Sequence, residues 1–366
     1  MRIAVPKEIR EGEKRVALVP DIINKLTRLG YEVSIESGAG THSQATDEDF
    51  KSAGASVVNG DVLKDADVVL SVSPLTPAQM SSLKKGALTI SFLSPVTAVD
   101  SIDAAVSAGV TAFSLELVPR ISRAQSMDAL TSQALCAGYR AVLVGAEMSP
   151  RFFPLLMTAA GTVTPAQVLV LGAGVAGLQA IGTAKRLGAV VEVTDIRPET
   201  KEQVESLGGK FISFDLGNDV KTEGGYVKVA GEDVLKRQRE ILKKHLAVAD
   251  CVITTALIPG RKAPVLITED MVNVMKFGSV IVDMAVEQGG NCELSKADEV
   301  IERNGVKIVG LTNLAGMLPQ NASEGYAKNI YNFLTHLATK EGMKWEREEE
   351  ITKGTLICHQ GEILRK

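Results

Sequence analysis

The feature that most constrains this chain is a glycine-rich turn between an apolar strand and a helix. Residues 167–171 form an apolar strand-like run, residues 172–177 spell Gly-Ala-Gly-Val-Ala-Gly, and a helical pattern covers 175–187. A second apolar strand at 190–194 is followed at once by Asp195. A glycine-rich hexad alone is a weak signal, but this context of strand, helix and acidic residue is the complete dinucleotide-binding fingerprint. The sequence therefore predicts a Rossmann domain.

Each residue of the fingerprint has a physical role. Gly172 permits the tight turn, Gly174 lets the backbone approach a pyrophosphate, and Gly177 allows close packing of helix and strand. The helix N-terminus offers unpaired N–H groups and a positive dipole end to phosphates. Asp195 is expected to accept hydrogen bonds from the adenosine ribose, which favours NAD over NADP because a 2′-phosphate would meet a carboxylate; Arg197 weakens this preference. The other residues expected at this site are Ala173, Val175, Ala176 and Ile196.

The rest of the chain alternates short apolar runs with amphipathic segments. This rhythm predicts an α/β protein of two domains, each a mostly parallel sheet with flanking helices. The first domain is expected over 1–137, completed by 328–366, and the Rossmann domain over 138–327. The predicted strands cover 3–5, 31–35, 68–72, 88–92, 251–254, 280–283 and 307–309, and further helices cover 21–29 and 327–337. The polar, glycine-containing segment 216–238 is interpreted as a long loop or mobile flap.

Composition excludes several classes of function. A net charge of -4 in 366 residues gives no electrostatic reason to expect nucleic acid or an anionic membrane as a partner. The cysteines are scattered, without a C-x-x-C pair, so we expect reduced thiols, no zinc site and no other metal site; they are Cys136, Cys251, Cys292 and Cys358. No apolar stretch of about 20 residues and no signal segment is present, so a soluble protein is expected.

Histidines are scarce, and this bears on the reaction. A dehydrogenase that oxidises an alcohol or amine must also move a proton, usually through His or Lys near the nicotinamide. None of the four histidines lies in a stretch that resembles the end of an active-site strand; they are His42, His245, His336 and His359. Hydride exchange between two nicotinamides needs no such group, so the pattern favours that chemistry.

Two further stretches carry a family resemblance. Residues 6–10 with 15–20, and residues 254–268, are similar to alanine dehydrogenases and to the NAD(H)-binding (alpha, domain I) subunits of proton-translocating NAD(P) transhydrogenases. The resemblance covers essentially the whole chain. Residues 119–128, Pro-Arg-Ile-Ser-Arg-Ala-Gln-Ser-Met-Asp, resemble the Arg-Gln-Asp loop of transhydrogenases, which alanine dehydrogenases lack. Other matches to the transhydrogenases lie at 200–211, 224–226 and 289–292.

The catalytic residues of alanine dehydrogenases are missing from the corresponding stretches. That family places a Lys and a His at strand ends of its first domain, whereas residues 70–74 and 91–95 here contain neither. The resemblance therefore implies the NAD(H)-binding subunit of a transhydrogenase, in a form in which that subunit is a separate polypeptide. An alanine dehydrogenase-like amino-acid dehydrogenase and a non-enzymatic NAD-binding module remain as alternatives.

The resemblance also assigns roles to single residues. Arg120, Gln125 and Asp128 would hold the nicotinamide end of NAD(H) as the catalytic set, and Gln125 would also reach toward the second nucleotide. Thr131 would bond to the carboxamide, and Tyr226 would lie at the tip of a loop that closes over the nucleotide. The expected cofactor contacts also include Thr255, Ala256 and Leu257. The alternative for Arg120 and Asp128 is a solvated ion pair in a loop.

The implied assembly follows from the same resemblance. A hydride would pass directly between NAD(H) on this chain and NADP(H) on a partner component, coupled to proton translocation by membrane-spanning subunits. The chain would be a homodimer, cytoplasmic and peripheral on the inner face of the plasma membrane through those partners, without inserting into the bilayer itself.

Overall fold

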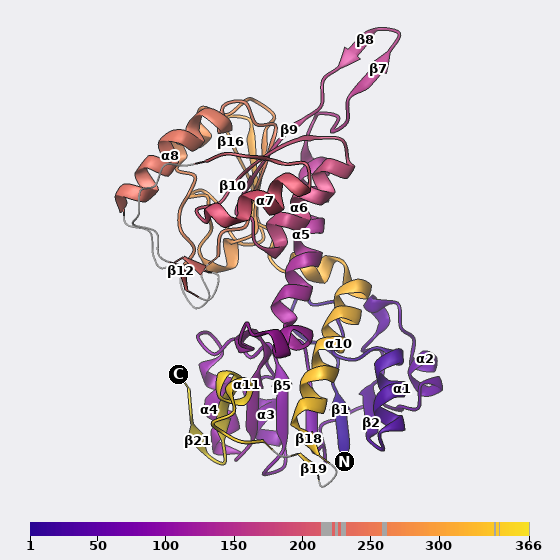
Figure 1. Cartoon of the computed structure of the whole chain (residues 1–366). Coiled ribbons are helices and arrows are strands. Elements are labelled where there is room, and N and C mark those ends of the chain that lie inside the picture. The colour runs from indigo at the N-terminus through magenta and orange to yellow at the C-terminus, as the bar shows by residue number, and fades with distance from the viewer. Residues whose placement is uncertain are drawn as a thin grey trace. The chain divides into compact units, whose positions relative to one another are not determined.

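A computed structural model describes residues 1–213, 222–223, 226–227, 232–257, 262–339, 342–343 and 345–365. The chain forms two compact units (Figure 1). Unit 1 comprises Met1–Gln133 with Ala315–Lys366, and unit 2 comprises Ala134–Leu314. The predicted domain boundaries stay a prediction. Among the residues described, no helix is both long and apolar enough to cross a membrane.

Unit 1 is built on an eight-stranded sheet in the order β21-β20-β6-β5-β4-β1-β2-β3. Neighbouring strands from β1 to β6 pair in parallel, whereas β20 pairs antiparallel with both β6 and β21. The C-terminal segment thus joins the first sheet. The strands are β1 (Arg2–Val5), β2 (Glu32–Glu36), β3 (Ser56–Val58), β4 (Val68–Leu70), β5 (Leu88–Ser91), β6 (Thr111–Ser114), β20 (Leu356–His359) and β21 (Glu362–Ile363).

Helices of unit 1 bury apolar stripes against this sheet. The helix α1 buries Ile22, Ile23 and Leu26, as its period of apolar residues predicts. The helices are α1 (Pro20–Arg28), α2 (Asp47–Ser52), α3 (Pro77–Ser82), α4 (Val99–Ser107), α10 (Pro319–Leu337) and α11 (Glu350–Thr355), with the 3-10 turns η1 (Thr41–Ser43), η2 (Leu115–Leu117) and η3 (Ser122–Met127) and the hairpin β18 (Ala338–Thr339) and β19 (Gly342–Met343). The helix α5 (Ala129–Met148) begins in unit 1 and continues into unit 2.

The helix predicted over 327–337 begins earlier than expected, at Pro319. Its first turns contain Pro, Gln, Asn, Ser and Gly, a composition that resembles a loop. Pro is nevertheless compatible with the first helical position, and Ala322 and Tyr326 are fully buried, so the buried stripe extends into these turns. Packing against the core of unit 1 therefore outweighs the weak local propensity.

Unit 2 is built on a seven-stranded sheet in the order β11-β10-β9-β14-β15-β17-β16. All pairs are parallel except the hairpin of β16 and β17. From β11 to β17 the order is that of a Rossmann fold, which confirms the predicted fold class. The strands are β9 (Gln167–Leu171), β10 (Val190–Thr194), β11 (Lys210–Phe211), β14 (Cys251–Thr254), β15 (Val280–Asp283), β16 (Val300–Arg303) and β17 (Val306–Val309).

The reversal of strand order beside β9 is a topological switch point of the sheet. In doubly wound sheets, ligands lie outside the carboxyl ends of the strands at such a switch point. The remaining elements of unit 2 are α6 (Val175–Arg186), η4 (Pro198–Thr200), α7 (Lys201–Ser206), α8 (Glu232–Leu246), α9 (Glu269–Val272), η6 (Val286–Gln288), β7 (Leu156–Thr158), β8 (Gly161–Val163), β12 (Thr222–Glu223) and β13 (Tyr226–Val227), while η7 (Leu314–Met317) joins the two units. The hairpin of β7 and β8 stands out from the body of unit 2 (Figure 1).

The prediction of a loop over 216–238 is wrong for its last seven residues. Residues 232–238 are the first turns of α8, which runs to Leu246. This segment is rich in Glu, Lys, Arg and Gln, which are strong helix formers, and its later turns bury Leu242 and Leu246. The hairpin of β12 and β13 lies within the expected loop. Residues 214–221, 224–225 and 228–231 lie outside the described residues.

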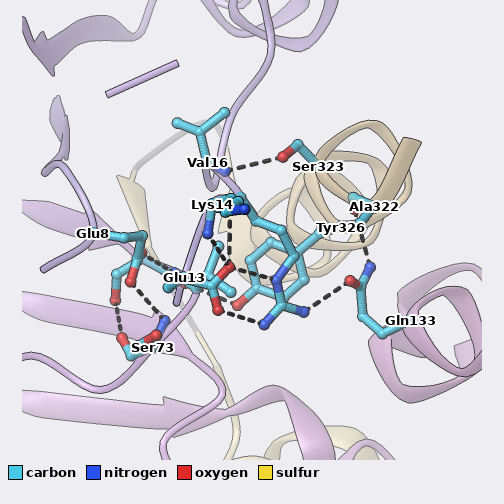
Figure 2. A network of polar contacts seen from close by, with 12 residues as sticks. Glu8, Glu13, Lys14, Val16, Ser73, Gln133, Ala322, Ser323 and Tyr326 are labelled. Atoms are coloured by element: carbon cyan, nitrogen blue, oxygen red, sulfur yellow. Dashed lines mark hydrogen bonds and ion pairs between the residues drawn. The ribbon is translucent and has the colours of Figure 1, made fainter. Parts of the chain in front are cut away.

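A network of buried and half-buried polar groups, shown in Figure 2, includes the residues that follow β4 in unit 1. The Glu8 carboxylate accepts hydrogen bonds from Val72 N at 2.6 Å and Ser73 N at 3.1 Å. Close by, Arg15 forms a bidentate pair with Glu13, with its Nη2 2.6 Å from Glu13 Oε2. Burial is the main cause that raises the pKa of Glu8 from 4.5 to about 7. The hydrogen bond from Val72 N lowers the pKa, whereas the negative charge of Glu13 raises it further.

This raised pKa predicts how stability depends on pH. The folded state favours the protonated Glu8, so its contribution is complete below pH 4.5 and is lost as pH rises through about 7. We expect the free energy of unfolding to fall by up to about 3 kcal/mol between pH 5 and 8. Glu8→Gln should flatten this slope, measured by urea unfolding at several pH values. Substitution of the exposed Glu11 by Gln is the control, and an unchanged slope in Glu8→Gln would exclude Glu8 as its source.

Candidate functional site

The glycine-rich turn connects β9 to α6, and two of its glycines are required by the fold itself. Gly172 has a φ of +106°, and a Cβ there would lie 2.5 Å from Thr255 Oγ1. A Cβ on Gly177 would lie 1.9 Å from the carbonyl oxygen of Gly172. The third glycine differs, because a Cβ on Gly174 would have no atom of the described residues within 4 Å, apart from those of its two chain neighbours. The position of a side chain at Gly174 is therefore unoccupied by the described residues, and the fingerprint uses this glycine so that the backbone can approach a pyrophosphate.

The helix α6 presents its N-terminus at this turn. Gly174 is the N-cap residue, and no side chain caps the helix there. The first-turn residues Val175, Ala176 and Gly177 carry backbone N–H groups that have no partner within a helix. These N–H groups and the helix dipole together favour a bound phosphate. The turn therefore fits the pyrophosphate of a dinucleotide.

Asp195 follows β10 and is tied to the glycine-rich turn. Its Oδ2 accepts a hydrogen bond from Ala173 N at 2.7 Å. Arg197 approaches the same carboxylate through its backbone N (2.8 Å), Nε (2.9 Å) and Nη2 (2.8 Å). The Asp195 side chain is only 6% exposed. Each carboxylate oxygen thus accepts two hydrogen bonds, so a ribose hydroxyl can bond to Asp195 only when the Arg197 side chain gives up a contact. Ile196 lies between these two residues.

The chain after β14 borders the turn. Thr255 donates its backbone N–H to Leu171 O at 2.8 Å and its hydroxyl to Gly172 O at 3.1 Å. This hydroxyl therefore holds the glycine-rich turn in place. Ala256 and Leu257 come next, half-buried, and residues 258–261 lie outside the described residues. The structure thus brings together Gly172, Ala173, Asp195, Arg197 and Thr255.

Two buried polar residues near this edge were missed by the sequence analysis. Asn291 bonds to the backbone of Ala256, and Asp283 accepts hydrogen bonds from Thr254 Oγ1 and Cys292 N. Both are fully buried. The sequence offered two indications: Asn291 lies in the stretch 289–292, which resembles transhydrogenases, and Asp283 ends an apolar strand. Neither indication reveals which backbone groups these side chains bond to.

The Arg-Gln-Asp loop lies in unit 1, where it leads into α5. Arg120 and Gln125 are exposed, whereas Asp128 is half-buried. Asp128 accepts hydrogen bonds from Thr131 N at 2.9 Å and from Thr131 Oγ1 at 2.7 Å. Asp128 therefore acts as an N-cap of α5 and also orients the Thr131 hydroxyl. This structural role was not expected from the sequence.

The loop is anchored at several points within unit 1. Asn329 and Asn332 of α10 donate from Nδ2 to Ser126 O at 2.9 Å and 3.0 Å. The Arg123 guanidinium pairs with Glu349 at 2.5 Å. Although burial opposes it, hydrogen bonds from Thr352, Ile351, His336 and Arg123 lower the pKa of Glu349 to about 2. The loop is thus held on both sides of Gln125. Tyr226 lies in β13, and its side chain is outside the described residues.

Two family models cover nearly the whole chain. The model of the alanine dehydrogenase/PNT N-terminal domain matches residues 4–137, and that of the C-terminal domain matches residues 141–366. The chain belongs to the alanine dehydrogenase/PNT family. The family resemblance predicted from the sequence is confirmed. Membership of the alanine dehydrogenase/PNT family supports binding of a nicotinamide dinucleotide.

Named relatives within the alanine dehydrogenase/PNT family include both expected groups. The chain is 50% identical to a Rhodospirillum rubrum protein named as the first portion of NAD(P) transhydrogenase subunit alpha, covering 100% of this chain and 98% of that protein. It is 31% identical to an alanine dehydrogenase of Mycolicibacterium smegmatis, covering 100% and 95%. A crystal structure of transhydrogenase from Sinorhizobium meliloti superposes with a TM-score of 0.87 at 44% identity, covering 99% of this chain and 98% of that one.

Proposed function

We propose that this chain is the NAD(H)-binding subunit of a proton-translocating NAD(P) transhydrogenase. The observation that carries the proposal is the 50% identity over the full chain to a relative named as a transhydrogenase alpha subunit, against 31% to an alanine dehydrogenase. The relative's name, a subunit, also supports the existence of partner subunits. One partner would hold NADP(H), and others would span the membrane and conduct protons. The complex would place this chain on the cytoplasmic face of the plasma membrane.

The resemblance to transhydrogenases assigns different parts of the nucleotide to two sets of residues. In unit 2, the N-terminus of α6 would bind the pyrophosphate and Asp195 the adenosine ribose. In unit 1, Arg120, Gln125 and Asp128 would hold the nicotinamide end, with Thr131 bonding to the carboxamide. Tyr226 would belong to a loop that covers the nucleotide.

The bound nicotinamides would supply the hydride chemistry, a direct transfer between their C4 atoms. No proton moves in that step, so the protein needs no acid or base. The residues of this chain would contribute orientation and the exclusion of water. The exposed Arg120 and Gln125, on a loop anchored through Ser126, suit a role in orienting a ligand that must face a second nucleotide.

An amino-acid dehydrogenase is the second candidate, because the chain also shares 31% identity with an alanine dehydrogenase. The stretch 70–74 argues against it. There the Ser73 backbone N–H donates a hydrogen bond to the Glu8 carboxylate, and Ser71 donates its hydroxyl to Ser73 O at 2.7 Å. Similarly, Glu116 accepts hydrogen bonds from Leu93 N and Ser94 N in the stretch 91–95. These strand ends carry neither the Lys nor the His of alanine dehydrogenases.

The deciding experiment measures hydride transfer from NADPH to an NAD analogue of distinct absorbance. The purified chain is assayed alone and mixed with a transhydrogenase NADP(H)-binding component. Turnover only in the mixture is expected. NADH oxidation with pyruvate and ammonia by the chain alone, without turnover in the mixture, would establish the amino-acid dehydrogenase instead. A chain that binds NADH but turns over in neither assay would be a non-enzymatic module.

Selectivity for NAD over NADP should depend on Asp195. In Asp195→Ala, NADH binding should weaken about tenfold because hydrogen bonds to a charged acceptor are lost. NADPH binding should strengthen at the same time, because the Arg197 guanidinium loses its carboxylate partner and meets the 2′-phosphate. Isothermal titration with both nucleotides checks this, with Arg197→Ala as the matched variant that should keep the NAD preference. Equal weakening of both nucleotides in Asp195→Ala would show that Asp195 only supports the turn.

We further propose a homodimer in which the β7–β8 hairpin takes part. Apolar side chains on and beside this hairpin are exposed: Phe152 by 62%, Leu155 by 56% and Met157 by 84%. Exposed apolar groups gathered on a projecting segment are typical of an interface. Sedimentation of the purified chain should therefore give a dimer, and Met157→Glu should shift it toward monomer. A monomeric unsubstituted chain would contradict this proposal.

A further inference from the structure

Asn291 is a buried residue whose side-chain amide forms hydrogen bonds with the backbone of Ala256 and of Pro264. Its Oδ1 accepts a hydrogen bond from Ala256 N at 3.0 Å, and its Nδ2 donates to Ala256 O and to Pro264 O, each at 2.8 Å. The residue is 0% exposed. One amide thus serves three backbone groups, at the start and at the end of the segment that follows β14.

The position of Asn291 is itself firmly set. Leu266 N and Ile267 N both donate to Asn291 O, at 2.8 Å and 2.9 Å. The next residue, Cys292, donates its N–H to Asp283 Oδ2 at 2.9 Å. The preceding Gly290 has a φ of +80°, and a Cβ there would lie 2.9 Å from the same Oδ2. The backbone around Asn291 therefore leaves its amide little freedom to move.

A short path connects Asn291 to the glycine-rich turn. Asn291 bonds to both backbone groups of Ala256, and the adjacent Thr255 bonds to the carbonyl oxygens of Leu171 and Gly172. We propose that Asn291 is a positioning residue for nucleotide binding, which fixes Ala256 and, through Thr255, the turn that receives the pyrophosphate. This inference rests on the proposed function, because it assumes that the turn binds NAD(H).

Asn291→Asp tests the inference with a side chain of the same size. Above its pKa the introduced carboxylate still accepts from Ala256 N but offers no donor to Ala256 O and Pro264 O. NADH binding to the full chain at pH 8 should therefore weaken about tenfold, as expected when buried acceptors lose their donor. Burial and the two facing carbonyl oxygens raise the pKa of the introduced carboxyl above the ordinary value of about 4. At pH 5.5 its protonated form donates one hydrogen bond. The NADH affinity of Asn291→Asp, relative to that of the unsubstituted chain, should therefore be several-fold higher at pH 5.5 than at pH 8.

Ser279→Ala is the matched control. Ser279 is also buried in unit 2 and donates its hydroxyl to Ala249 O at 3.0 Å, at the opposite, amino end of β15. Its loss should lower the stability against urea and leave NADH affinity unchanged. Asn291→Asp with normal affinity at pH 8, a deficit that does not change with pH, or an equal deficit in Ser279→Ala would each overturn the positioning role. An unsubstituted chain that fails to bind NADH would instead refute the proposed function, and the inference with it.

Discussion

Asp128→Asn is expected to lower the rate of hydride transfer about 100-fold while NADH affinity stays within a few-fold of the unsubstituted chain. Asp128 caps α5 through Thr131 N and the Thr131 hydroxyl. Asn is as good an N-cap as Asp, so its amide oxygen keeps the bond to Thr131 N and the fold stays intact. Only the negative charge and one acceptor are lost. If Asp128 and Thr131 orient the nicotinamide ring, a small misplacement of the reacting atoms costs about 100-fold in rate.

The measurement is single-turnover transfer from NADPH to an NAD analogue, in the mixture with the NADP(H)-binding component, beside an NADH titration. Asp128→Ala is the companion variant: it removes the cap as well and should lower the stability of unit 1 by about 1 kcal/mol. A collapse of NADH binding in Asp128→Asn would make Asp128 a binding residue. Full activity in Asp128→Asn would reduce its role to capping α5.

Gly174→Ala should produce a folded protein that binds NADH more weakly. Apart from its two chain neighbours, no described residue would have an atom within 4 Å of a Cβ at this position, and the backbone has an ordinary φ of -77°. The cost in stability should stay below about 1 kcal/mol, the penalty for Ala at an N-cap. The fingerprint, however, uses this glycine so that the backbone can approach the pyrophosphate. The added methyl group should therefore weaken NADH binding by about tenfold or more through the lost approach to the phosphates.

Gly177→Ala supplies the contrast. A Cβ there would lie 1.9 Å from Gly172 O, so the chain itself must shift, and stability should fall by about 3 kcal/mol or more. Urea unfolding and isothermal titration of both variants separate the two effects. Normal NADH affinity in Gly174→Ala would show that the nucleotide does not approach this turn, whereas an unfolded Gly174→Ala would show that the space beside Gly174 is not open.

Much of the fold follows from local patterns. The strands that were predicted lie within a residue or two of observed ones, because parallel strands buried on both faces are continuous apolar runs, such as 167–171 and 251–254. The fingerprint was found because its constraints are local: Gly172 needs a positive φ, and Gly177 must let the helix lie close to the strand. The prediction was wrong in the first turns of α10, where packing outweighs a loop-like composition. It was also wrong for residues 232–238, where a polar segment without an apolar period is helical because it is rich in strong helix formers.

By itself, the sequence determined the fold class, the family and the location of the nucleotide fingerprint, since each depends on residue types at fixed spacing along the chain. Only the tertiary structure decided how the site residues are engaged. Asp195 is held by Arg197, Asp128 caps α5, and Asn291 reaches Ala256 across 35 positions of sequence. The physical reason is that a side-chain hydrogen bond is directional and reaches about 3 Å, so its partner is chosen by where the folded backbone brings a donor or acceptor. Distance along the chain does not contain that information.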